Sequence, residues 1–317
     1  MMNGADENEP RSTPDVEPQL LEDDDRSRCV SPFQGAPAII LGGLVMGIGA
    51  ALYFWIWPGG DYVGMLTVST CLVGVGFFAH GTAGIMRKRR LQVARLRHPR
   101  EPWRYDYRWP QDGVRDDTLR RIVRGALIIG YVLLFLVPFN LMVLGGTIQQ
   151  GRIYVFVVLG DLAVAIGLVY ESYMTVRWIK YGRSYLSYRT FPFYLGRPLE
   201  VTFCNNRFTR HCRRLEITLR CIQERAQHGY RLYQSEVQRY QMYADKQVID
   251  DAAELLGGEI AIRFDLPVPT EDLETQLSER PPCYWELMVT SEVRGIDFES
   301  TFLVPVYRPP SDERERR

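Results

Sequence analysis

Four long apolar segments constrain the fold of this chain more than any other feature of its sequence. Each has almost no charged residue and exceeds the roughly 20 residues that a helix needs to cross about 30 Å of hydrocarbon. Short links join the first segment to the second and the third to the fourth, so we expect two transmembrane hairpins, at 36–86 and 121–176. The four apolar segments are residues 36–57, 63–86, 125–147 and 153–174.

The average composition conceals this organisation. The 317 residues contain 38 basic and 38 acidic side chains, and the mean hydropathy of -0.16 is typical of a soluble protein. Residues 1–35 are acidic, contain several prolines and lack apolar periodicity, so we expect a disordered tail there. Residues 311–317 form a second charged tail. We expect no secretory signal, because an acidic tail precedes the first apolar segment.

The distribution of basic residues predicts the orientation of the helices. The segment 87–124 carries thirteen basic residues against five acidic ones, whereas the links at 58–62 and 148–152 contain a single arginine, Arg152. Loops rich in lysine and arginine stay on the cytoplasmic side of a membrane. We therefore expect the loop at 87–120 and both chain termini to be cytoplasmic.

This loop contains a run of arginines, aromatic residues and prolines, HPREPWRYDYRWP, at 98–110. Tryptophan and tyrosine favour the depth of the lipid headgroups, and arginine binds anionic phosphates there. We interpret the run as a connector held to the membrane surface. RNA or DNA binding is not expected, because no strands with basic and aromatic residues accompany the run. The residues expected to contact anionic headgroups are Arg100, Trp103, Arg104, Tyr105, Tyr107, Arg108 and Trp109.

The apolar segments themselves favour helix packing over transport. The first contains GGLVMGIGAA, in which Gly43 and Gly47 have the spacing that allows two helix backbones to approach closely. We expect these two glycines to lie where two helices are in close contact.

Polar residues within the apolar segments are few. Asp161 lies deepest, and we expect it either to form a structural hydrogen bond or to serve as a proton or cation site. His80 and Glu171 lie near the inner ends of their helices, where Arg124 is within reach. The simpler interpretation of this group is an ion pair between helices.

Beyond residue 185 the periodicity changes to a two-residue alternation, which is typical of half-buried antiparallel strands. In EIAIRFD at 259–265, for example, Ile260, Ile262 and Phe264 share one face. Six or seven such segments predict an antiparallel β-sandwich over 185–310. The expected fold is an α + β membrane protein, with four transmembrane helices in two hairpins followed by a cytoplasmic sandwich.

Two groups of motifs carry a resemblance to known proteins. The loop contains a PW-x-x-x-D segment, here Pro102, Trp103 and Asp106, and the end of the chain contains LPVP at 266–269, YWEL at 284–287, GIDFESTF at 295–302 and VPVY at 304–307. With these motifs, residues 31–307 resemble a family of uncharacterised bacterial integral membrane proteins. The resemblance implies an arrestin-like or immunoglobulin-like sandwich, the bacterial inner membrane as location, and no catalytic residues to carry over.

Motifs for chemistry are absent from the sequence. It contains no GxxxxGK[ST], HExxH, GxSxG or CxxC segment. Cys204, His211, Cys212 and Cys221 do not have the paired spacing of a structural zinc site, so we expect no metal. A cytoplasmic location also predicts reduced cysteines. We therefore expect no cofactor and no enzymatic activity.

The function expected from these features is that of a noncatalytic membrane protein. Its cytoplasmic sandwich would serve as a protein-interaction or assembly module, with an unidentified protein partner and anionic lipids as contacts. The alternative is a small transporter or channel subunit with Asp161 in its pathway. Oligomerisation is compatible with either function.

Overall fold

The computed structural model describes most of the chain between residues 19 and 310. The predicted tails at 1–35 and 311–317 lie outside the described residues, except for 19–21. The described residues are 19–21, 36–56, 61–146, 151–205, 207, 214–228, 235–250, 259–268, 273–278, 282–291, 293 and 295–310.

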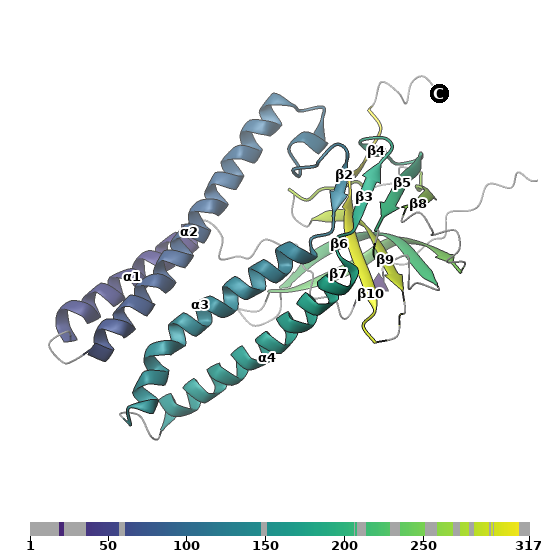
Figure 1. Ribbon diagram of the computed structural model, residues 1–317. Helices are drawn as coiled ribbons and strands as arrows, with labels where there is room; N and C mark the ends of the chain where they lie inside the picture. The colour runs from purple at the N-terminus through teal and green to yellow at the C-terminus, as the bar shows by residue number, and fades with distance from the viewer. Residues whose placement is uncertain are drawn as a thin grey trace, which may run out of the picture.

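Four helices form two pairs, and a β domain lies at one end of the second pair (Figure 1). Within the described residues, three helices are long and apolar enough to cross a membrane: Thr67–Arg97, Thr118–Leu144 and Tyr154–Tyr181. The apolar part of the first helix is shorter there, Ala36–Ala51. These helices suggest a membrane protein. The full bounds of the helices are α1 (Ala36–Ile56), α2 (Asp61–Arg97), α3 (Thr118–Leu144) and α4 (Arg152–Tyr181).

Glycines bring α1 and α2 into close contact, but they are not the two predicted from the sequence. A Cβ atom at Gly42 would lie 2.7 Å from the Gly74 carbonyl oxygen, and one at Gly49 would lie 2.8 Å from a cysteine sulfur of α2. Nothing lies within 4 Å of a Cβ at Gly43 or Gly47. The two pairs occupy different faces of α1, so Gly43 and Gly47 do not contact α2, and close helix packing at these two residues stays a prediction. Gly42 and Gly49 are two turns apart and face α2, whereas Gly43 and Gly47 are exposed.

Replacing Gly42 with alanine is expected to destabilise the α1–α2 pair by about 1–3 kcal/mol, because the added methyl group has no space between the two backbones. The matched control is Gly43→Ala, which adds the same methyl group one residue away in open space. It should change stability by less than about 1 kcal/mol. Thermal unfolding in a mild detergent compares the two variants, and equal midpoints would contradict the observed packing.

Two antiparallel sheets and a short parallel pair make up the β domain. Two strands precede the predicted boundary of the β domain at residue 185: β2 comes from the loop between the helix pairs, and β1 comes from the predicted tail at 1–35 and pairs with β7. The first sheet has the order β1 (Gln19–Leu20), β7 (Ser235–Ile249), β6 (Leu215–His228), β9 (Cys283–Ser291), β10 (Phe298–Val304). The second has the order β2 (Gly113–Arg115), β3 (Tyr185–Tyr188), β5 (Pro198–Cys204), β8 (Glu259–Asp265). The parallel pair is β4 (Phe193–Tyr194) with β11 (Val306–Tyr307).

One hydrophobic core lies between the inward faces of the two sheets. The predicted alternation is confirmed in β8, where Ile260, Ile262 and Phe264 are buried and the residues between them are exposed. Trp285 of β9 is fully buried in the same core. The second sheet contributes Leu199 and residues of β3 to it. Packing of these faces against each other removes both from water.

The β domain is bonded directly to the ends of α3 and α4. Arg177 of α4 donates to the carbonyl oxygen of Glu299 at 2.7 Å, and Lys180 donates to that of Ile296 at 3.1 Å. At the start of α3, the Asp116 carboxylate accepts hydrogen bonds from the Thr118 backbone N–H at 3.0 Å and, on its other oxygen, from the Ser300 hydroxyl at 2.9 Å. These bonds fix the orientation of β10 relative to both helices.

Candidate functional site

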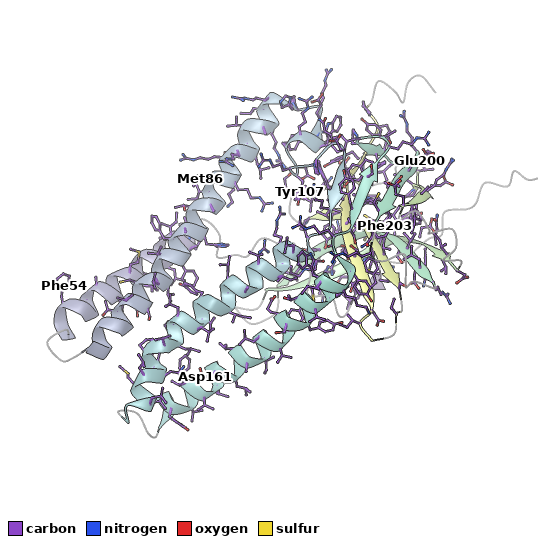
Figure 2. All side chains as sticks on the ribbon, viewed as in Figure 1. Phe54, Met86, Tyr107, Asp161, Glu200 and Phe203 are labelled. Carbon is purple, nitrogen blue, oxygen red and sulfur yellow. The ribbon has the colours of Figure 1, made fainter. Side chains whose placement is uncertain are left out.

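The arginine-rich run after α2 folds against the β domain. A short 3-10 helix, η2 (Pro102–Arg104), turns the chain, and Trp109 packs with Ile222, Tyr284 and Leu303 in a second hydrophobic cluster. Only 9% of Trp109 is exposed. Figure 2 shows Tyr107 between the end of α2 and the strands. The second cluster therefore lies on the face of β6 and β9 opposite the main core.

A buried hydrogen-bonded chain links this run to the end of the β domain. Trp109 Nε1 donates to the Tyr307 hydroxyl at 2.8 Å, and that hydroxyl donates to Asp106 Oδ2 at 3.3 Å. The backbone N–H of Ser278 donates to Asp106 Oδ1 at 2.6 Å. The ring of Trp103 meets that of Tyr307 edge-on at 6.0 Å. Residues of the PW-x-x-x-D and VPVY motifs thus contact each other.

Burial is the main cause of the pKa shifts of Asp106 and Tyr307 in this chain of hydrogen bonds. It raises the pKa of the Asp106 carboxyl above its ordinary value, although hydrogen bonds from Ser278 and Tyr307 oppose the shift. Burial also raises the pKa of the Tyr307 phenol, and the nearby Asp106 carboxylate adds to that effect. The Tyr307 hydroxyl therefore keeps its proton and can donate to Asp106.

Lowering the pH is expected to stabilise the wild type relative to Asp106→Asn. Because the folded pKa is raised above the unfolded value of about 3.9, the folded state holds the proton more tightly. This contribution is present below the unfolded pKa and is lost as the pH rises through the folded pKa. Unfolding midpoints of both proteins from about pH 4 to about pH 8 measure the difference. A difference that grows in favour of the wild type with rising pH would contradict the raised pKa.

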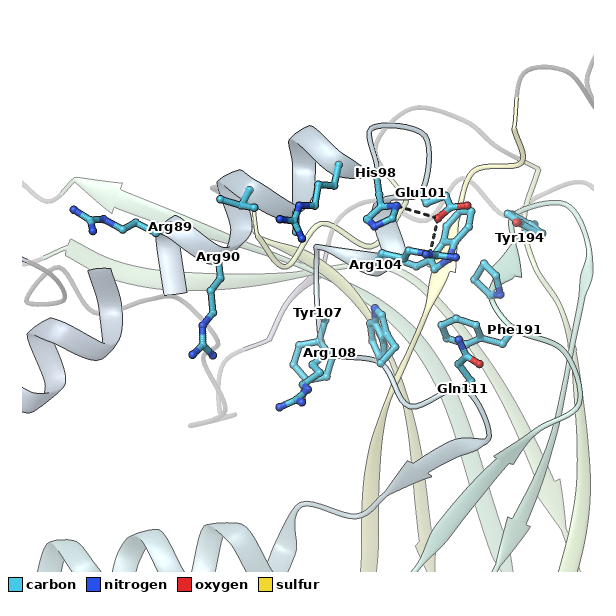
Figure 3. Close-up of a pocket in the computed structure, with 16 residues that line it drawn as sticks. Arg89, Arg90, His98, Glu101, Arg104, Tyr107, Arg108, Gln111, Phe191 and Tyr194 are labelled. Atoms are coloured by element: carbon cyan, nitrogen blue, oxygen red, sulfur yellow. Dashed lines mark ion pairs between the residues drawn. The ribbon is translucent and has the colours of Figure 1, made fainter. Parts of the chain in front are cut away.

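A cavity of about 1070 Å³ that is largely open to the outside lies between α2, this run and the segment 191–194 (Figure 3). One wall is the last part of α2, the second is the run itself, and the third comes from the β domain. The lining residues are Arg89, Arg90, Val93, Ala94, Arg97, His98, Glu101, Trp103, Arg104, Tyr107, Arg108, Trp109, Gln111, Phe191, Pro192 and Tyr194.

The cavity lining is strongly basic. It contains five arginines and one acidic residue, Glu101. Glu101 already pairs with Arg104 at 2.5 Å and lies 3.7 Å from His98 (Figure 3). Within the part of the chain that the structure describes, Arg90 and Arg108 have no acidic partner. The cavity therefore carries positive charge that side chains of the described residues do not neutralise.

The structure separates the predicted lipid-contacting residues into those that line the cavity and those that do not. Trp103, Arg104, Tyr107 and Arg108 line the cavity, together with the accessible edge of Trp109. Arg100 and Tyr105 do not line it. Tyr105 lies under Arg95, whose guanidinium is 5.4 Å from the ring centre.

Trp109 requires a correction, because its ring is buried within the protein and cannot lie among lipid headgroups in this arrangement. Its indole N–H has a protein acceptor, the Tyr307 hydroxyl, so the polar group that would face a headgroup is already satisfied. For the exposed arginines, contact with lipid stays a prediction.

Asp161 forms a hydrogen bond between two helices, which is one of the two roles expected for it from the sequence. Asn140 of α3 donates to Asp161 of α4 at 3.0 Å, on the part of the pair that lies away from the β domain (Figure 2). The Glu171 carboxylate lies against Gly125, and one of its oxygens is buried without a hydrogen-bond partner among the described residues. The structure shows no ion pair between the described residues Glu171 and Arg124, and His80 is exposed.

A network of buried charges on the outer face of the first sheet was not predicted. Arg220 pairs with Glu286 at 2.5 Å, and Arg239 lies 3.8 Å from Glu286 and 3.9 Å from Glu224. The Tyr284 hydroxyl donates to Glu224 at 2.8 Å. All four charged side chains are at least nine-tenths buried. In the sequence Arg220 and Glu286 alternate with apolar residues, which is also the pattern of a strand with one face in water. The sequence therefore does not indicate that they are buried.

The sequence candidates for zinc do not come together in the described residues. Cys204 and Cys221 lie on different sheets, and His211 and Cys212 lie outside the described residues. Among the residues that the structure describes, no group of three His, Cys, Asp or Glu side chains could hold a metal ion. The Cys221 and Cys283 sulfur atoms are 3.5 Å apart and are free thiols, and burial raises the pKa of Cys221.

No protein-family model matches the chain, and a search of curated proteins gives no match. The function must therefore be argued from the geometry of the molecule.

Proposed function

We propose that this chain is a noncatalytic integral membrane protein of the bacterial inner membrane. It crosses the membrane four times, with both termini in the cytoplasm, and presents a cytoplasmic β-sandwich as an interaction or assembly module. The lengths of the apolar segments support four crossings. The basic residues of the loop support the orientation. The shared core of two antiparallel sheets supports the sandwich.

The proposal rests mainly on a difference between the two edges of the β domain: one is joined to the helices and the other is not. On one side, β2 continues towards α3, and β10 accepts the hydrogen bond from Arg177 of α4. At the other end of the second sheet, β8 pairs only with β5 within the described residues, and it lies away from the helices (Figure 1). Among the described residues, the domain is thus fixed by one side, and no strand pairs with the opposite edge, which we call the open edge. An open edge is where an extended segment of a partner adds as a further strand.

The backbone groups at the open edge can be assigned to individual residues of β8. The N–H and C=O groups of one residue in a strand point to the same side, and the side alternates along the strand. Gln247 Nε2 donates to the Arg263 carbonyl oxygen at 2.6 Å, so the backbone groups of Arg263 point away from β5. Those of Ala261 point the same way, and its side chain is exposed. The Ala261 N–H is therefore free of the ladder with β5.

Ala261→Pro tests strand addition at this edge. Proline removes the outward N–H and is tolerated on an edge strand, because the ladder to β5 does not use that group. The control is Ala261→Val, which enlarges the same exposed side chain but keeps the N–H. Each intact protein is purified from its native membrane in mild detergent, and the proteins that accompany it are quantified.

A stoichiometric partner that is retained by the wild type and Ala261→Val but lost from Ala261→Pro would support the proposal. Thermal unfolding must show that all three proteins are folded. The proposal would be overturned if no partner accompanies the wild type, or if the same partner accompanies all three proteins. In the second case, another surface of the β domain recruits it.

The alternative is a transporter or channel subunit that uses Asp161. The hydrogen bond from Asn140 supports a bracing role for Asp161 between α3 and α4, because it supplies the partner that a carboxyl group in hydrocarbon requires. We therefore favour the module over the transporter.

A further inference from the structure

We propose that the cavity between α2, the run at 98–110 and the segment 191–194 binds a ligand that carries a phosphate group. The arginines hold the phosphate, and an apolar part of the ligand lies against the aromatic wall. This inference goes beyond the proposed recruitment of a protein partner, because it concerns a different surface and a different kind of ligand.

Uncompensated charge is the first argument. Arg89, Arg90 and Arg97 approach the cavity from α2, and Arg104 and Arg108 approach it from the run. Among the described residues, Glu101 is the one acidic residue of the lining, and Arg104 and His98 already engage it. Like charges that converge without counter-charge repel one another, and a bound anion removes that repulsion. Guanidinium groups match phosphate oxygens in a planar, bidentate geometry.

The arginines that reach the cavity come from two different elements. In Figure 3 the side chains of Arg90, from α2, and Arg108, from the run, extend into the space between these elements. The run is held against the β domain by the bond from Trp109 to Tyr307, and the end of α2 is held there by the hydrogen bond from Arg95 to the Ser278 hydroxyl at 3.0 Å. A phosphate between them would therefore meet donors that are already positioned, which lowers the cost of ordering on binding.

The aromatic wall is the second argument. Trp103 and Tyr194 meet edge-on at 6.3 Å, and Trp103 also packs against the buried Tyr307. Phe191 packs against the second hydrophobic cluster. The wall is thus supported from behind by buried side chains, and it presents an apolar surface beside the arginines. A bare inorganic ion would leave this surface unused.

The position along α2 identifies two sources for such a ligand. Arg90 follows Met86, the last residue of the apolar segment, by four positions, or about 6 Å along the helix axis. The headgroup layer on each side of a bilayer is about 5–7 Å thick. Arg97 lies about 16 Å beyond Met86. One end of the cavity therefore reaches the headgroups and the other opens to the aqueous side, so the phosphate can belong to an anionic lipid or to a soluble phosphate compound.

The test uses the intact protein in neutral detergent micelles and measures binding by calorimetry. One arm titrates short-chain phosphatidic acid, with short-chain phosphatidylcholine as the zwitterionic comparison. The other arm titrates glycerol 3-phosphate and inorganic pyrophosphate. The cavity variant is Arg90→Gln with Arg108→Gln. The matched control is Arg87→Gln with Arg100→Gln, which removes the same charge from α2 and the run at positions that do not line the cavity.

We expect the wild type to bind phosphatidic acid or one of the soluble phosphates more tightly than phosphatidylcholine. The cavity variant should bind that ligand about 25-fold more weakly, at about fivefold for each arginine lost. The control should remain within about threefold at moderate salt, since exposed charges are screened there. Unfolding midpoints show whether both variants are folded.

Selective binding of phosphatidic acid assigns the site to a lipid headgroup, whereas binding of glycerol 3-phosphate or pyrophosphate assigns it to a soluble compound. Both results support a phosphate site. Two results overturn it. The first is that the wild type binds none of the phosphate probes. The second is that the cavity variant and the control variant lose affinity equally, which would mean that general surface charge accounts for the binding.

Discussion

Replacing Glu286 with alanine is expected to destabilise the β domain by about 3–5 kcal/mol, because the substitution removes a buried carboxylate that lies against two buried arginines. Glu286 pairs with Arg220 at 2.5 Å and lies 3.8 Å from Arg239. Arg220 is 8% exposed and Arg239 is 3% exposed, so water cannot replace the lost carboxylate without opening the outer face of the sheet.

The control for this substitution is Glu216→Ala on the neighbouring strand β6. Glu216 pairs with Lys246 at the same distance, 2.5 Å, but both side chains are at least one-third exposed. Its loss should cost at most about 1 kcal/mol. The two variants are compared by denaturant unfolding in detergent, followed through the fluorescence of the buried Trp285. Equal destabilisation would show that the outer face is hydrated and that the network does not depend on burial.

Trp109→Ala is expected to cost a similar amount, about 3–5 kcal/mol, and also to release the run at 98–110 from the β domain. The substitution empties the centre of the second hydrophobic cluster and removes the donor to the Tyr307 hydroxyl. Trypsin should then cleave faster after Arg104 and Arg108, which are exposed on the run. Cleavage rates in detergent without lipid measure this release.

Trp109→Phe separates the two contributions of the side chain. Phenylalanine retains much of the apolar surface and loses only the indole N–H, so the expected cost falls to about 1–3 kcal/mol, because the Tyr307 hydroxyl oxygen loses its donor while the hydroxyl still donates to Asp106. If trypsin cleaves the wild type, Trp109→Phe and Trp109→Ala at the same rate, Trp109 does not hold the run in place. Lipid contact would then be its remaining role.

Regular patterns in the sequence predicted the elements that depend on local periodicity. The apolar segments correspond to the helices, and the alternation at 259–265 corresponds to the buried and exposed faces of β8. Both patterns arise because a helix or strand repeats the direction of its side chains at a fixed interval.

Features that depend on contacts between distant segments could not be predicted in the same way. The spacing of Gly43 and Gly47 fits a packing motif, but spacing alone does not show which face of α1 meets α2. Tryptophan prefers a place between water and an apolar phase. For Trp109, Tyr284 and Leu303 provide such a place just as lipid would. An aromatic residue shows the same preference in either environment.

The candidate site was predicted only in part for the same reason. The arginines of the cavity lie within 89–108 and were recognised as a basic group, whereas the aromatic wall includes Phe191 and Tyr194 from the β domain. No local signal connects these residues with the loop. Asp106 was recognised as part of a motif, but its burial depends on Tyr307 at the far end of the chain.

The contact between Trp109 and Tyr307 also determines when, during synthesis, the run at 98–110 can reach its final position. The two residues are 198 positions apart, and a ribosome adds about 5–20 residues each second, so the indole N–H of Trp109 has no native acceptor for about 10–40 s after it is made. Through that interval the nascent chain contains an aromatic, arginine-rich segment that adjoins apolar helices. The surface of the bilayer is the environment that such a segment prefers before its strand partners exist. The preference for lipid that is evident in the sequence thus suits an early stage in the life of the chain, and translation of the last strand ends it.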